Sequence, residues 1–131
     1  MRRILEESGA ADLYEGLVAL LERLVGRYRP LAVLVAGSLA DGRFVRGLSD
    51  VDLLVVVDRG VDRLERFQLY AVKDVDVEVA VVPLGELVEA VRRCNEFYRR
   101  ALCRGLLVYG DEAGVSRLKG ELCGSSRGTC G

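Results

Sequence analysis

The run from Asp50 to Asp58 constrains the fold of this chain more than any other feature. It reads Asp-Val-Asp-Leu-Leu-Val-Val-Val-Asp. A run of β-branched and aliphatic residues of this length is typical of a buried strand. Asp52 lies inside the run, and a buried carboxylate is costly unless a partner compensates its charge. The run therefore predicts an inner strand with a functional acidic group near its beginning.

Helical and strand patterns alternate along the rest of the chain. Apolar residues at three- and four-residue spacing predict an amphipathic helix over 11–28, which Pro30 ends. An apolar run over 31–36 predicts a buried strand, and glycine-rich 37–49 predicts a loop with one helical turn. The elements expected after the central strand are a helix over 61–72, a strand over 75–81, a helix over 83–102 broken near Cys94 and Asn95, a short strand over 106–109 and a weak helix over 111–122.

This order of elements predicts a mixed α/β (α+β) fold, with a small mixed sheet and flanking helices. The length of 131 residues fits one domain. We expect the domain to span residues 1–123. The polar, glycine-rich segment 124–131 is expected to be a mobile tail unless Cys130 is bonded.

Composition excludes several classes of function. The chain has no histidine, which removes histidine acid–base catalysis, Ser-His-Asp triads and histidine-containing zinc sites. The four cysteines form no Cys-x-x-Cys pair, so we expect buried thiols or a disulfide holding the tail. A net charge of −1 argues against a general nucleic-acid coat, although local basic patches stay open. The longest uncharged stretch, 30–40, is too short for a membrane span. Glu6 and Glu7 follow the N-terminal basic residues in place of a signal-peptide core, so a cytoplasmic location is expected.

Paired carboxylates indicate a metal site. Asp50 and Asp52 leave the same face of a strand with Cα atoms roughly 6.6 Å apart, so both can reach one or two metal ions. Asp58 lies about 20 Å further along an extended strand and is expected to be a turn residue. On the strand over 75–81, Asp76 and Glu78 share one face. If the two strands are neighbours, these carboxylates require a cation such as Mg²⁺; the other interpretation of the alternation is a solvated sheet surface.

Gly37 and Ser38 mark the corner where the first strand opens into the loop. Glycine lets backbone amides approach an anion, and a serine hydroxyl adds a donor, so the corner suits phosphates. The alternative is a simple strand-ending turn. The chain has neither a P-loop motif nor a Gly-x-Gly-x-x-Gly dinucleotide motif.

The motifs Gly37-Ser38-Leu39-Ala40-Asp41-Gly42 and Ser49-Asp50-Val51-Asp52-Leu53-Leu54-Val55 resemble the signature of the DNA polymerase β superfamily of nucleotidyltransferases. Among these, the chain looks most like the small, stand-alone minimal nucleotidyltransferases. The resemblance covers roughly residues 31–83. It implies the polymerase-β-like nucleotidyltransferase fold and a Mg²⁺-dependent transfer of a nucleoside monophosphate, AMP from ATP first, to an acceptor hydroxyl with release of pyrophosphate.

The resemblance also implies residue roles. Gly37 and Ser38, with Ser49, would hold the nucleotide triphosphate, and Asp50 and Asp52 would bind Mg²⁺, in a site typical of two metals. A third carboxylate on a neighbouring strand would complete the metal site and assist deprotonation of the acceptor. Asp76 is the first choice for it and Glu78 the second.

The loop departs from the family pattern, because Leu39 and Asp41 stand where arginines are common. Arg43 or Arg46 could replace those arginines. Similar proteins often pair with a helical HEPN-domain protein in toxin–antitoxin systems. The competing hypothesis is therefore an antitoxin-like module that binds and neutralises such a partner, with or without transferring AMP to it. A homo-oligomer is a further expectation, because the chain has little room for a separate substrate-recognition domain.

Overall fold

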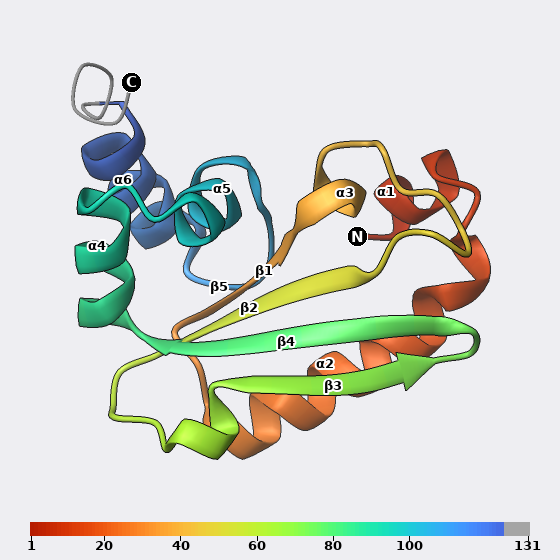
Figure 1. Ribbon diagram of the computed structural model, residues 1–131, viewed down its shortest axis with the longest axis horizontal. Coiled ribbons are helices and arrows are strands. Elements are labelled where there is room, and N and C mark those ends of the chain that lie inside the picture. The colour runs from red at the N-terminus through yellow and green to blue at the C-terminus, as the bar shows by residue number, and fades with distance from the viewer. Residues whose placement is uncertain (125–131) are drawn as a thin grey trace.

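A five-stranded mixed sheet forms the centre of the computed structural model, which describes residues 1–124 (Figure 1). The strands are β1 (Ala32–Ala36), β2 (Val51–Val57), β3 (Phe67–Val72), β4 (Val75–Pro83) and β5 (Leu106–Gly110). Their order across the sheet is β3-β4-β2-β1-β5. The pair β2–β4 is parallel, and the other three pairs are antiparallel. This architecture confirms the predicted mixed sheet.

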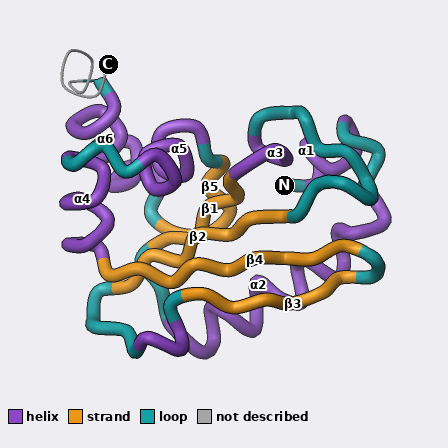
Figure 2. The backbone as a smooth tube through the Cα atoms, viewed as in Figure 1, coloured by secondary structure: helices purple, strands orange, loops and turns teal. Residues whose placement is uncertain are grey.

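Helices cover both faces of the sheet (Figure 2). The helical elements are α1 (Arg2–Glu7), η1 (Ala11–Leu13), α2 (Tyr14–Tyr28), α3 (Gly37–Ala40), η2 (Arg63–Glu65), α4 (Leu84–Arg92), α5 (Glu96–Arg104) and α6 (Glu112–Cys123). The elements α1, η1 and α2 pack on one face, and α4, α5 and α6 pack on the other. Within residues 1–124, no helix combines the length and the apolar character that crossing a bilayer requires.

The strands divide the core into two clusters because alternate residues of a strand point to opposite faces. Along β2, Leu53, Val55 and Val57 join the cluster under α2, while Leu54 and Val56 join the cluster under α4–α6. Asp52 has the parity of Leu54 and Val56. Its side chain therefore belongs to the α4–α6 face of the sheet.

The segment 61–72 corrects the sequence-based expectation of a helix. It contains only the short η2, followed by strand β3. The helical spacing rested on Leu64, Phe67 and Ala71, whereas the side chains over 67–72 alternate in exposure with a period of two, as in a strand. A tight turn at Lys73 and Asp74 then joins β3 to β4, and Lys73 adopts a positive φ of 54°. Pairing with β4 therefore prevailed over the local helical spacing.

The expected break in the helical region 83–102 is confirmed and separates α4 from α5. Cys94 takes a positive φ of 64°, which a continuing helix does not allow. Asn95 then caps α5, because its side-chain oxygen accepts a hydrogen bond from the Tyr98 amide at 3.2 Å. The strand expected over 106–109 and the helix expected over 111–122 are present as β5 and α6.

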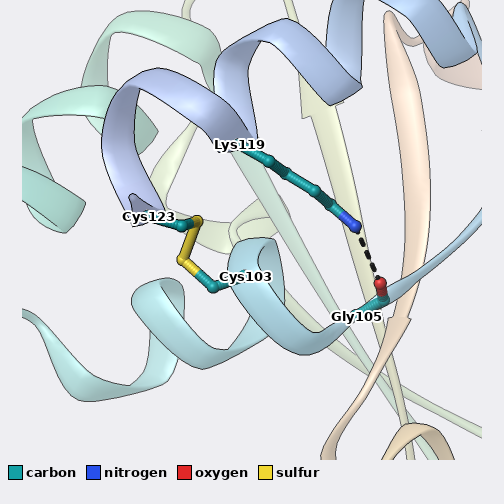
Figure 3. The surroundings of a disulfide bond; sticks show 4 residues. All are labelled: Cys103, Gly105, Lys119 and Cys123. Carbon is teal, nitrogen blue, oxygen red and sulfur yellow. Dashed lines mark hydrogen bonds between the residues drawn. A yellow bond between two sulfur atoms is a disulfide. The ribbon is translucent and has the colours of Figure 1, made fainter. Parts of the chain in front are cut away.

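A disulfide joins Cys103 at the end of α5 to Cys123 at the end of α6 (Figure 3). Beside it, the Lys119 ammonium donates a hydrogen bond to the Gly105 carbonyl at 3.2 Å. These contacts attach α6 to α5 and to the beginning of β5. The expected tail after Gly124 and the question of Cys130 lie outside the described residues.

Candidate active site

The strand register brings Asp52 and Glu78 together. In the parallel pair β2–β4, Asp52 is the partner of Glu78. In the antiparallel pair β1–β2, Asp52 is the partner of Ala36, the residue immediately before Gly37. Residues at paired positions of neighbouring strands present their side chains on the same face. Asp52 therefore lies between Glu78 on one side and the Gly37–Ser38 corner on the other.

The other predicted carboxylates take different positions. Asp50 is exposed and immediately precedes β2, within electrostatic range of Asp52. Asp76 is exposed, two residues before Glu78, and is paired with Ala71 of β3. Asp58 follows the far end of β2, as expected for a residue outside the site. Of the two candidates for the third carboxylate, Glu78 is the one opposite Asp52.

The pKa of Asp52 is raised from 3.8 to about 7. Burial is the largest cause, and a hydrogen bond with Glu78 and the negative charges of Glu78 and Asp50 contribute the rest. This is the electrostatic consequence of placing carboxylates side by side in a partly desolvated position. The site therefore favours a bound positive charge.

The donor set fits a hard divalent cation, because it consists of closely spaced carboxylate oxygens and the charged groups acting on Asp52 are all acidic. Asp52 and Glu78 are adjacent, and Asp50 is close enough for its charge to act on Asp52. Among residues 1–124, no group of three or more histidine, cysteine, aspartate or glutamate side chains is already arranged to hold a metal ion. The fit thus rests on the Asp52–Glu78 pair, with Asp50 as the nearby third donor.

Gly37 is required by its contact with Asp52. Its φ is +67°, and a Cβ atom at this position would collide with the Asp52 carboxylate. Ser38 follows it in α3, and both residues are half-buried. The loop between α3 and β2 leaves from here, with the Arg43 amide donating to the Ser38 carbonyl at 2.8 Å. A glycine is therefore the only residue that lets this corner approach the carboxylate without strain.

Ser49 closes the loop that precedes Asp50. Its hydroxyl oxygen accepts a hydrogen bond from the Val45 amide at 3.0 Å, and its own amide donates to the Val45 carbonyl at 2.8 Å. Buried Phe44 anchors the same loop in the core under α2. Ser49 thus has a structural contact in addition to the phosphate-binding role expected from the sequence.

Arg46 connects the loop between α3 and β2 to two segments that are distant in the sequence. Its guanidinium donates to the Asp12 carboxylate at 2.7 and 3.0 Å and to the Asp74 carboxylate at 2.6 and 3.2 Å. Arg43 pairs with Asp41 at 3.3 Å. The side chains expected to replace the missing loop arginines are therefore both engaged with carboxylates. No sequence signal indicated the Arg46 contacts, because Asp12 and Asp74 are 34 and 28 residues away from it.

A nucleotidyltransferase domain model matches residues 17–103, which is about two-thirds of the chain. The chain belongs to this nucleotidyltransferase domain family. The matched segment contains Gly37, Ser38, Asp50, Asp52 and Glu78. Membership supports nucleotidyl transfer as the general activity of the domain.

A solved structure with a similar fold supports the architecture of the domain. It is the nucleotidyltransferase-like protein from Exiguobacterium sibiricum 255-15, with a TM-score of 0.52 and 17% sequence identity. The alignment covers 72% of this chain and 32% of that protein, so this chain spans about a third of the length of the structure that it matches. No curated protein matches the sequence. At this identity, the likeness concerns the fold.

Proposed function

We propose that this nucleotidyltransferase domain is a Mg²⁺-dependent enzyme that transfers a nucleoside monophosphate to an acceptor hydroxyl. The first candidate for the transferred group is AMP, with ATP as its donor. The observation that carries the proposal is the pairing of Asp52 with Glu78 beside the Gly37–Ser38 corner. A corner suited to phosphates and a crowded group of carboxylates then lie next to each other. This is the arrangement that phosphoryl transfer requires.

In the proposed reaction, Gly37 and Ser38 bind the triphosphate, and Asp50 and Asp52 hold Mg²⁺. The bound metal supplies charge neutralisation at the phosphates. The acceptor oxygen forms a bond to the α-phosphorus while the bond from the α-phosphorus to the bridging oxygen breaks. Pyrophosphate leaves with that electron pair, and the acceptor proton moves to the Glu78 carboxylate. Glu78 is preferred to Asp76 for this role because it is the register partner of Asp52.

Calorimetric titration of Mg·ATP into the purified protein tests the proposal. We expect binding that requires Mg²⁺ and is lost in Asp50→Asn and Asp52→Asn. Asp58→Asn is the matched control, because Asp58 is an exposed aspartate at the opposite end of β2. Equal Mg·ATP affinity in wild type and in both site variants would contradict the proposed metal ligands.

A HEPN-domain protein is the second candidate, as a partner that the chain binds or modifies. Large apolar side chains are exposed on β5 and in the loop before β2, namely Leu106, Tyr109, Val45 and Leu48. Leu106 and Tyr109 lie on the edge strand β5, where exposed apolar side chains favour contact with another protein. Size-exclusion chromatography of the chain, alone and with a candidate partner, tests both this pairing and self-association. Mass spectrometry of the partner after incubation with ATP tests whether AMP is transferred to it.

A further inference from the structure

A cavity of about 470 Å³ opens beside the two paired carboxylates. Its walls include Asp52, Glu78, Phe67, Leu69, Asn95 and Phe97. These residues come from β2, β4, β3 and the beginning of α5 with its cap. The volume lies within the range of about 300–1,000 Å³ that is usual for small-molecule sites.

The outer wall of the cavity is an apolar surface that the fold leaves uncovered. Helices α4–α6 pack over one end of this sheet face, where Leu54, Val56, Ala80 and Val82 are buried. Beyond Ala80, on the edge strand β3, Phe67 and Leu69 are each 66% exposed, and Phe97 across from them on α5 is 43% exposed. Large apolar side chains grouped around a cavity are typical of a binding site.

The order of the strands determines where the cavity lies relative to the carboxylates and the Gly37–Ser38 corner. Across the sheet, the Gly37–Ser38 corner follows β1, Asp52 is on β2, Glu78 is on β4 and Leu69 is on β3. The register extends the row, because Asp52 pairs with Glu78 and Glu78 pairs with Leu69. The phosphate corner and the apolar wall therefore lie on opposite sides of the carboxylates. A molecule in the cavity therefore lies on the Glu78 side of Asp52, away from the Gly37–Ser38 corner.

The charge of the cavity limits what it can bind. Of the described residues that line it, none is a lysine or an arginine, and two are carboxylates. Arg66, which precedes Phe67, is held by Glu86 through hydrogen bonds of 2.5 and 2.9 Å. Binding of a polyanion depends on cationic side chains that neutralise its phosphates. The cavity therefore disfavours the phosphate backbone of a nucleic acid.

We propose that this cavity is the acceptor subsite, and that it takes an uncharged acceptor whose hydroxyl is carried by an aromatic or aliphatic group. The inference rests on the proposed function, because it assumes transfer to a hydroxyl beside Glu78. Phe67, Leu69 and Phe97 contact the apolar part of the acceptor. The Asn95 side-chain oxygen already accepts from the Tyr98 amide, and its amide nitrogen donates to a polar atom of the acceptor.

Titrations followed by amide resonances of ¹⁵N-labelled protein test the inference without requiring turnover. The probes are 3-phenylpropan-1-ol, a hexa-adenylate with a free 3′-hydroxyl, and Mg·ATP. We expect the alcohol to shift the amides of Phe67, Leu69 and Phe97, and Mg·ATP to shift those of Gly37 and Ser38. We expect hexa-adenylate to leave the cavity amides unchanged.

Substitutions give the second readout. Phe67→Ser should weaken the affinity for the alcohol about fivefold, because it removes apolar contact area. Mg·ATP affinity should be unchanged. Phe97→Ser is an independent variant from the opposite wall, should Phe67→Ser fail to fold. The matched control is Leu64→Ser, because Leu64 is 91% exposed and lies outside the cavity lining.

The outcomes separate this inference from the proposed function. Shifts with Mg·ATP but none with the alcohol at the cavity would overturn the acceptor subsite alone. Shifts of the cavity amides with hexa-adenylate instead of the alcohol would overturn the uncharged acceptor. Shifts with the alcohol but none with Mg·ATP would overturn the proposed function and, with it, the assignment of the cavity to an acceptor.

Discussion

Asp52 of β2 lies directly opposite Glu78 of β4, and this pairing defines the centre of the site. Asp76 shares the face of Glu78 but pairs away from β2, with Ala71 of β3. A shift of two residues in the register would exchange the two acidic side chains. The register therefore favours Glu78 over Asp76, the residue expected first from the sequence.

The first prediction compares these two carboxylates. Glu78→Gln should lower the rate of nucleotidyl transfer by about 100-fold or more, because it removes the group proposed to accept the acceptor proton. Asp76→Asn should lower the rate less than about threefold, since Asp76 pairs with Ala71 of β3 and is not opposite Asp52. Single-turnover transfer from labelled ATP measures both. A larger loss in Asp76→Asn than in Glu78→Gln would assign the third carboxylate to Asp76.

The second prediction concerns Gly37. Gly37→Ala should destabilise the fold by about 1–2 kcal/mol through its positive φ, and it should also abolish Mg·ATP binding by displacing Asp52. Gly42→Ala is the matched control, because Gly42 has a φ of +74° but open space where a Cβ would stand. Denaturant unfolding should show a loss of stability in both variants, larger in Gly37→Ala because its Cβ also meets the Asp52 carboxylate. Calorimetry should show loss of binding in Gly37→Ala alone.

The third prediction concerns Arg46 as a positioning residue for the loop that carries Asp50. Arg46→Gln removes the hydrogen bonds to Asp12 and Asp74, and the affinity for Mg·ATP should fall about fivefold as the loop loosens. Arg46→Lys should restore little, because a lysine cannot bridge two carboxylates with a planar fork. Arg43→Gln, in the same loop, serves as the control, since Arg43 is exposed and pairs only locally with Asp41. An unchanged affinity of Arg46→Gln for Mg·ATP would show that Arg46 does not position the loop for binding.

The fourth prediction is a pH dependence of stability. Hydrogen bonding to Arg46 lowers the pKa of Asp12 from 3.8 to about 2, and Lys73 adds to the effect. A lowered pKa in the folded protein means that this stabilisation is present above about pH 4 and is lost as the pH falls toward 2. The thermal midpoint should therefore decline less between pH 4 and pH 2 in Asp12→Asn than in wild type. Asp62→Asn is the control, because Asp62 is exposed and its side chain makes no cap hydrogen bond. The thermal midpoint of this variant should decline as much as that of wild type.

The fifth prediction concerns the disulfide between α5 and α6. The double variant Cys103→Ser, Cys123→Ser should lower the free energy of unfolding by about 3 kcal/mol, because the bond closes a loop of sequence separation 20. Urea unfolding measures this change. Mg·ATP affinity should stay the same, since neither cysteine belongs to the site. A loss of affinity in the folded double variant would show that the α5–α6 pair supports the site directly.

Local patterns in the sequence predicted most of the elements and four residues of the candidate site. Strand β2 follows from its apolar run, and α2 from its periodicity and Pro30. The break between α4 and α5 was expected near Asn95, where the N-cap is found. Gly37 and Ser38, with Asp50 and Asp52, were expected from their spacing and their resemblance to a known signature. These features depend on neighbours along the chain, so the sequence alone determined them.

Tertiary structure decided what depends on contacts between distant segments. Strand β3 forms because pairing with β4 outweighs a weak helical spacing over 61–72. The choice of Glu78 as the partner of Asp52 depends on the β2–β4 register, which the side-chain period of two residues cannot fix by itself. The contacts of Arg46 with Asp12 and Asp74 join segments that meet only in the folded protein. The sequence thus determined which residues could act, while the packing of strands and loops determined which of them lie together.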